Sequence, residues 1–285
     1  MLEGESVTEF STIEYHKSES GVARIVLNRP DTRNAQNKRM LYELNDAFDL
    51  AGHDDEVKVV VLAANGPHFS SGHDMGDREP FSEFDAVSNW GGYTQGGQEG
   101  HWAFEEELYL GMCWRWRNFP KPTIAEVQGK VIAAGLMLVW VCDIIIASDD
   151  ATFSDPVVAF GVNGVEYFGH PWEFGVRKAK ELLFTGGVMS ALEAKSCGMV
   201  NHVVEASELT EFSTQMADRI AQRPMMGLKL AKQSVNQAQD AQGIWSALQS
   251  AMSLQQLGHA NARIVHGIPV DPEGAKVIKE EAKKA

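Results

Sequence analysis

The stretch over residues 127–147, VQGKVIAAGLMLVWVCDIIIA, most constrains what this chain can fold into. Small residues surround a glycine in its first half, and its second half is apolar and β-branched. It predicts a strand ending near Val127, a turn at Gly129, a buried helix opening near Ala133, and a strand over 143–147. The first N–H groups of a helix lack intrahelical partners, so small residues there let a ligand oxygen approach them. A segment packed only to fill the core would show the same pattern.

Composition and charge argue against several other classes of protein. The 285 residues carry 25 Lys and Arg against 39 Asp and Glu, and the net charge of −14 disfavours nucleic-acid binding. No G-x-G-x-x-G or G-K-[ST] motif indicates a nucleotide-binding loop. Three cysteines form no disulfide framework, and neither a signal peptide at residues 1–10 nor an apolar run of about 18 residues is evident. We therefore expect a cytoplasmic protein that does not bind a membrane.

Elsewhere, short β-branched runs alternate with helical spacings. The pattern predicts strands over 13–15, 22–27, 57–63, 151–153 and 200–204, and helices over 37–51, 177–184 and 190–195. From Ser207, which is expected as an N-cap, the spacing is helical to Gly258 with a break at Pro224. Residues 76–113, rich in glycine and aromatic residues, predict a long loop that is either a lid or a surface packed on a neighbouring subunit.

Three sequence motifs carry a family resemblance. The run F-S-S-G-H-D-M at 69–75, with P-K-P-T-I-A-E-V-Q-G at 120–129 and C-D-I-I-I-A at 142–147, resembles the crotonase family, the enoyl-CoA hydratase/isomerase superfamily. The resemblance extends from about Ala23 to Val204 and implies an α/β fold. The expected architecture is a crotonase-like spiral of ββα units over 12–206, followed over 207–285 by a C-terminal helical region that forms trimers or dimers of trimers.

The resemblance also implies a chemistry. Members of the family bind an acyl-CoA thioester and stabilise an enolate-like oxyanion with two backbone N–H groups, which fall here on His73 and Ala134. The family often has glycine at Ala133 and Ala134, but a backbone donor does not require glycine. Coenzyme A then arrives as part of the substrate, and no tightly bound cofactor is expected. No metal site is expected either, because His68 and His73 lack a third ligand at a suitable spacing.

Further residues are assigned to substrate binding by motif position. They are Arg33 and Ala35 near the adenine and phosphates, Gly72, Asp74, Met75 and Gly76 near the pantetheine, and Met137 and Val157 at the acyl group. The basic residues Arg29, Arg33, Lys38 and Arg39 together suit the CoA phosphates, whereas any one of them taken alone fits a solvated helix start better.

The acid/base residues depart from the family pattern. The two glutamates that hydratases use fall on Met137 and Val157, and neither side chain can move a proton. Glu166 is the nearest carboxylate, expected either as a base in an apolar pocket or as an ordinary helix-start glutamate. The His73 imidazole is not required by the motif, and Asp74, His101, Asp155 and His170 are weaker candidates. Hydration, double-bond migration and C–C cleavage stay open, and so does a non-catalytic acyl-CoA-binding or assembly protein that lost its bases.

Overall fold

The computed structural model describes residues 10–281 and contains two β-sheets. The six-stranded sheet has the order β1 (Ile13–Lys17), β2 (Val22–Leu27), β3 (Val59–Ala64), β4 (Thr123–Val127), β6 (Ile144–Ser148) and β9 (His202–Val204). The three-stranded sheet has the order β5 (Lys130–Ile132), β7 (Thr152–Ser154) and β8 (Val188–Ser190). Only β1 in the first sheet and β8 in the second pair antiparallel with their neighbours.

From β4 to β7, successive strands alternate between the two sheets, as in the predicted spiral. β4 lies in the large sheet, β5 follows in the small sheet, and α4 (Gly135–Trp140) closes the unit. β6 and β7 repeat the same division. The predicted crotonase-like α/β architecture is confirmed, and the predicted strands begin or end within two residues of the observed ones.

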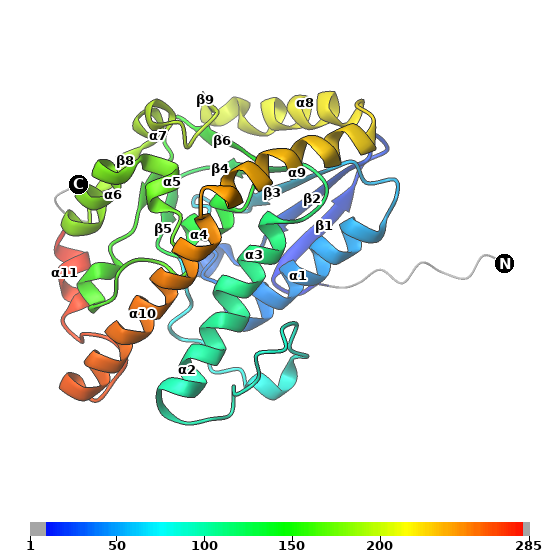
Figure 1. Ribbon diagram of the computed structural model, residues 1–285. Helices are drawn as coiled ribbons and strands as arrows, with labels where there is room; N and C mark the ends of the chain where they lie inside the picture. Colours follow the sequence, from blue (N-terminus) through cyan, green and yellow to red (C-terminus); the bar gives the residue numbers. More distant parts are fainter. Residues whose placement is uncertain (1–9, 282–285) are drawn as a thin grey trace.

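Helices cover both faces of the large sheet (Figure 1). Val59 and Val61 of β3 pack with α8 (Leu209–Ala221), whereas Val60 and Leu62 face the main core with α1 (Lys38–His53). Alternate residues of β3 therefore face opposite sides of the sheet, as expected for a strand. The remaining helices are α2 (Gly97–Glu105), α3 (Met112–Arg117), α5 (His170–Phe174), α6 (Val176–Thr185), α7 (Ala191–Cys197), α9 (Met225–Ala241), α10 (Ile244–His266) and α11 (Gly274–Glu281).

The C-terminal helices differ from the prediction at their ends. Ser207 lies inside a 3₁₀ turn that precedes α8, so the predicted N-cap is wrong. A second break at Gly243, where φ is +92°, separates α9 from α10. α10 also runs on through Gly258. A Cβ at this position would lie only 2.7 Å from the carbonyl oxygen of Gly161. This glycine permits close helix packing and does not end the helix.

The predicted loop over 76–113 is a loop only in its first half. From Gly97 to Arg117 the chain is continuously helical, with α2 and α3 joined by a π-helix at Glu106–Gly111. Aromatic stacking of Phe84 on Tyr42, with ring centroids 4.7 Å apart, holds the irregular half against α1. Within the described residues, no helix combines the length and apolarity that a membrane crossing requires. The prediction about the signal peptide falls mostly outside the described residues.

Candidate active site

The residues assigned to the oxyanion hole lie where the 69–75 motif runs beside β5. The Ser70 N–H donates to the Lys130 carbonyl at 3.3 Å, and the Ile132 N–H donates back to the Ser70 carbonyl at 3.0 Å. This pairing carries Gly72 against the start of α4. A Cβ on Gly72 would lie 2.9 Å from the Ile132 oxygen and 3.3 Å from the Ala134 nitrogen, and its φ of +89° also favours glycine.

Two backbone donors are left unused at this junction. Across residues 10–281, neither the His73 N–H nor the Ala134 N–H donates a hydrogen bond to a protein acceptor. Ala134 is fully buried and immediately precedes α4, while Ala133 adopts a left-handed conformation with φ of +49°. Hydrogen bonds from Gln36 N–H to the Gly72 carbonyl (2.8 Å) and from Asp74 N–H to the Gln36 carbonyl (2.9 Å) fix the backbone on either side of His73. Fixed backbone donors without a protein acceptor are what oxyanion stabilisation requires.

The side chains of His73 and Glu166 meet beside these donors. The distance from His73 Nε2 to Glu166 Oε2 is 3.1 Å, and the imidazole stacks on Tyr109 with centroids 3.7 Å apart. Gln255 of α10 donates to the other Glu166 oxygen at 3.4 Å. Glu166 is buried, with 5% of its surface exposed. It lies in the loop before α5, which begins only at His170, so the alternative of a helix-start glutamate is wrong.

The loop that carries Glu166 is anchored by its neighbours. Asp155 Oδ2 accepts the Val165 N–H at 3.0 Å and lies 2.8 Å from Nε2 of the buried His170. The Tyr167 N–H points to Met137 Sδ at 3.3 Å. Asp155 and His170, the weaker acid/base candidates, therefore hold the loop by bonding to each other and to its backbone.

Met137 and Val157 lie near this site without supplying a carboxylate. Met137 is fully buried in α4, and its sulfur contacts the backbone directly after Glu166. Val157 begins a 3₁₀ turn and is half-buried. Two of the assigned acyl-group positions thus offer apolar surface, and Glu166 is the carboxylate that reaches His73.

The predicted basic cluster is largely neutralised within the chain. Arg29 bonds to the Ala35 carbonyl and to Asp74 Oδ2, the latter at 2.9 Å. Lys38 and Arg39 likewise pair with acidic side chains. Arg33 is exposed and takes part in no ion pair within the described chain. Three of the four basic residues are therefore paired within the chain, and Arg33 is the one available to an anion.

Arg33 is tied to the oxyanion loop through the backbone. It has a left-handed φ of +56°, and its carbonyl accepts the Ser71 N–H at 3.0 Å. On the other side of the hole, Asp74 Oδ1 accepts the Gly76 N–H at 2.9 Å, and Met75 is 69% exposed. The assigned phosphate and pantetheine residues thus flank the two backbone donors.

Comparison with known proteins decides the family. A sequence profile described as Enoyl-CoA hydratase/isomerase matches residues 17–269. The chain belongs to the enoyl-CoA hydratase/isomerase family. It is 48% identical over 261 residues to the putative enoyl-CoA hydratase EchA13 of Mycobacterium tuberculosis, covering 89% of this chain and 82% of that protein. It is also 34% identical over 218 residues to human enoyl-CoA hydratase domain-containing protein 3, mitochondrial, covering 73% and 65% of the two chains.

Solved structures agree with this assignment. The crystal structure of a probable enoyl-CoA hydratase from Mycobacterium smegmatis is 47% identical, has a TM-score of 0.82, and the match covers 91% of this chain and 98% of that one. An enoyl-CoA hydratase/isomerase from Xanthobacter autotrophicus Py2 gives 30% identity, a TM-score of 0.80, and coverage of 96% and 94%. The protein is therefore an enzyme of the hydratase/isomerase family, and these names leave its exact reaction open.

Two contacts of this hydratase/isomerase family enzyme escaped prediction. Tyr109 reaches His73 from the π-helix, and Gln255 reaches Glu166 from α10, more than 80 residues away in sequence. Both contacts depend on how segments distant in sequence pack, so no local sequence pattern predicts them.

Proposed function

We propose that this enzyme forms an enolate from an acyl-CoA thioester at the junction of Gly72 and α4. The N–H groups of His73 and Ala134 would hold the thioester oxygen, and Glu166 would accept the α-proton. The observation that carries the proposal is the buried Glu166–His73 pair beside two unused backbone donors. This pair also favours an active enzyme over a binding protein that has lost its bases.

The chemistry follows from the direction of charge movement. When the α-proton passes to Glu166, the electron pair of that C–H bond moves onto the thioester oxygen, where two backbone donors stabilise it. His73 and Gln255 donate to the two Glu166 oxygens and would position the carboxylate for this transfer. Removing one donor from comparable holes costs about 3–4 kcal/mol of transition-state stabilisation.

Double-bond migration suits this site better than hydration. A buried water needs two or more polar partners, and Met137 and Val157 offer none at the positions assigned to the hydratase glutamates. For an enoyl thioester with an acidic α-proton, the protonated Glu166 would return the proton two carbons further along the dienolate. The proton and the electron pair then balance without a water or a second substrate.

The CoA end of the substrate would follow the motif. Arg33 is the exposed cation beside the loop, so it would meet a phosphate, while residues 74–76 would lie along the pantetheine. The Ala35 carbonyl accepts a hydrogen bond from Arg29, which would hold the backbone beside Arg33 in place.

Ligand binding and turnover test the proposal separately. A ligand that binds only the folded protein raises its unfolding temperature, so a CoA thioester should shift it while NAD and ATP-Mg shift it much less. Equal shifts with all three would contradict the ligand class. In absorbance assays, a 3-enoyl-CoA should isomerise faster than crotonyl-CoA is hydrated. Rapid hydration of crotonyl-CoA would refute the argument from Met137 and Val157.

We further propose a trimer or a dimer of trimers that buries part of the C-terminal helices. Met226 and Leu230 of α9 are 66% and 50% exposed, so they are available to a second copy. Ile244 and Leu248 of α10 are buried in the core of their own chain, so they are not available to a second copy. Sedimentation of a clean monomer at micromolar concentration would reject the assembly. The three cysteines are free, which is in keeping with a reducing cytoplasm.

A further inference from the structure

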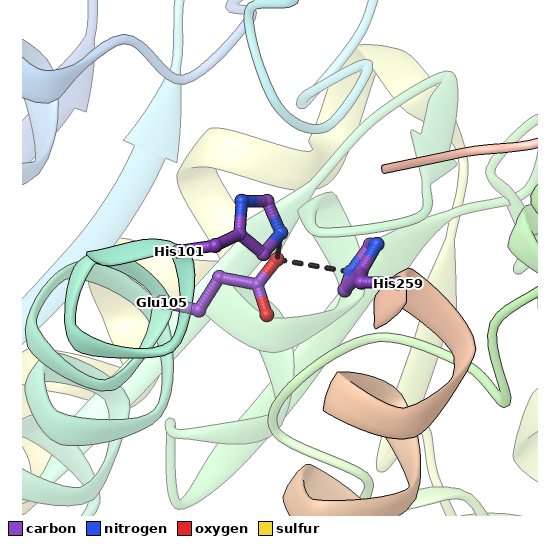
Figure 2. Close-up of side chains that lie close together, drawn as sticks. All are labelled: His101, Glu105 and His259. Carbon is purple, nitrogen blue, oxygen red and sulfur yellow. Dashed lines mark ion pairs between the residues drawn. The ribbon is translucent and has the colours of Figure 1, made fainter. Parts of the chain in front are cut away.

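A second polar cluster lies between α2 and α10 (Figure 2). His101 and Glu105 are one helical turn apart on α2, and His259 faces them from α10. The Nε2 atoms of His101 and His259 lie 2.9 and 3.1 Å from the same Glu105 oxygen, Oε1. Glu105 and His259 are buried, while the His101 side chain is 20% exposed and gives access from the surface.

The hydrogen-bond geometry of the cluster is incomplete. Both Nε2 atoms are buried, and neither directs a hydrogen bond at an acceptor within residues 10–281, despite their short distances to Oε1. His259 Nδ1 lies 2.5 Å from the Pro269 carbonyl and can donate only from that side in a neutral ring. The lone pair of its Nε2 then faces Glu105. If the His101 Nε2 is likewise unprotonated, three electron-rich atoms converge, and a bound cation would stabilise that arrangement.

The surroundings of Glu105 hold it in place for such a charge. Gln256 donates to Oε2 at 2.6 Å, which leaves Oε1 for the two imidazoles. Gln98 donates to the Gln256 oxygen at 2.6 Å, and Arg263 Nε donates to Gln98 at 3.2 Å. Such outer partners orient the ligands of a metal, as does the bond from His259 Nδ1 to a backbone carbonyl.

We propose that His101, Glu105 and His259 bind a divalent transition-metal ion such as Zn²⁺, Co²⁺ or Fe²⁺. Two imidazole nitrogens and one carboxylate oxygen form a ligand set that suits these ions and leaves further positions to water. The ion would join α2 to α10. Since Gln255 and Gln256 are adjacent on α10 and contact Glu166 and Glu105, it would also fix the helix that borders the proposed active site.

The sequence alone does not predict this site. His101 was considered only as a weak acid/base candidate, and its partner His259 lies in another helix far along the chain. A pair four residues apart on one helix face is common in solvated helices. Only the packing of α10 on α2 supplies the third ligand.

Metal titration tests the proposal directly. Full-length protein dialysed against a chelator is titrated with Co²⁺ at neutral pH, with visible absorption and elemental analysis as readouts. We expect one ion per chain, and a rise in the unfolding midpoint of roughly 5 °C at a hundredfold excess over Kd. Glu105→Gln and His259→Gln should abolish binding. His266→Gln, a histidine on α10 outside the cluster, should leave it unchanged.

His101→Asn is included because the variants of the buried Glu105 and His259 could fail to fold. Its side chain is partly exposed, so the variant should fold and lose both the Co²⁺ absorption and the metal-dependent rise in midpoint. Absence of saturable binding by the wild-type protein would overturn the proposal. Equal binding by wild type and His101→Asn would overturn it as well.

Discussion

The oxyanion turn around Gly72 and the cluster around Glu105 are both polar sites inside an apolar core, but different atoms build them. The first uses backbone N–H groups that a left-handed glycine and a short strand pairing bring together. The second uses side chains from two helices that approach only after the C-terminal region has packed. The backbone site therefore depends on local conformation, and the side-chain site depends on tertiary contacts and on charge compensation.

Substituting Gly72 should produce the largest effect and should leave the Glu105 cluster intact. Alanine at this position would meet the Ile132 oxygen at 2.9 Å in a strained conformation, and so displace the two donors. We expect kcat/KM to fall about 10²- to 10³-fold, as when one oxyanion donor is lost. Gly96→Ala, where the added carbon meets nothing within 4 Å, is the control. Unchanged kinetics in Gly72→Ala would place the oxyanion site elsewhere.

Substituting Glu107, which lies two residues from Glu105, should lower the stability of the fold. Its carboxylate accepts hydrogen bonds from Tyr42, Val87, Ser88 and Tyr93, and so holds the irregular 76–96 segment on α1. Glu107→Gln retains the shape but loses the charge, so we expect a loss of about 2 kcal/mol in unfolding free energy by denaturant titration. Glu99 is exposed on the same continuous helix, so Glu99→Gln should leave the unfolding free energy unchanged. Comparable stability for both variants would contradict this role.

Glu173 is a half-buried carboxylate whose side chain has no hydrogen-bond or ion-pair partner among residues 10–281. Burial raises its pKa from an ordinary 4.5 to about 8. The folded state then binds more protons than the unfolded state, so stability falls as pH rises from about 4.5 through 8 and is constant beyond. Glu173→Gln should match wild type at pH 4 and exceed it by about 2 kcal/mol at pH 9. Parallel pH–stability curves for the two proteins would rule out this penalty.

Arg33 should give the smallest effect, because an exposed ion pair with a phosphate is weak. Arg33→Ala should raise KM for a CoA thioester a few-fold and leave kcat nearly unchanged. The same substitution should have little effect on KM for a short pantetheine thioester without the phosphates. A large fall in kcat would instead link this residue to the oxyanion loop through Ser71, whose N–H bonds to its carbonyl.

These two regions also explain what the sequence could and could not predict. The strand–turn–helix unit, the two assigned backbone donors and the loop around Asp74 follow from local patterns and family motifs, and in the structure Gly72 lies against Ala134. The sequence marks Glu166 as a candidate base. Its burial and its bond to His73, however, depend on the loop that Asp155 anchors. The partners of Glu105 depend on α10, whose path around Gly243 and through Gly258 the periodicity did not show.

Exchange of acyl α-protons in deuterated water tests the central claim, that Glu166 transfers a proton at a backbone oxyanion hole. The exchange of a CoA thioester is followed by NMR with wild type, Glu166→Gln and, as a control, Glu173→Gln. We expect exchange with wild type and the control, and a loss of about 10²- to 10⁴-fold in Glu166→Gln. Exchange that persists unchanged in Glu166→Gln would contradict the account and leave Glu166 as a partner of His73 alone.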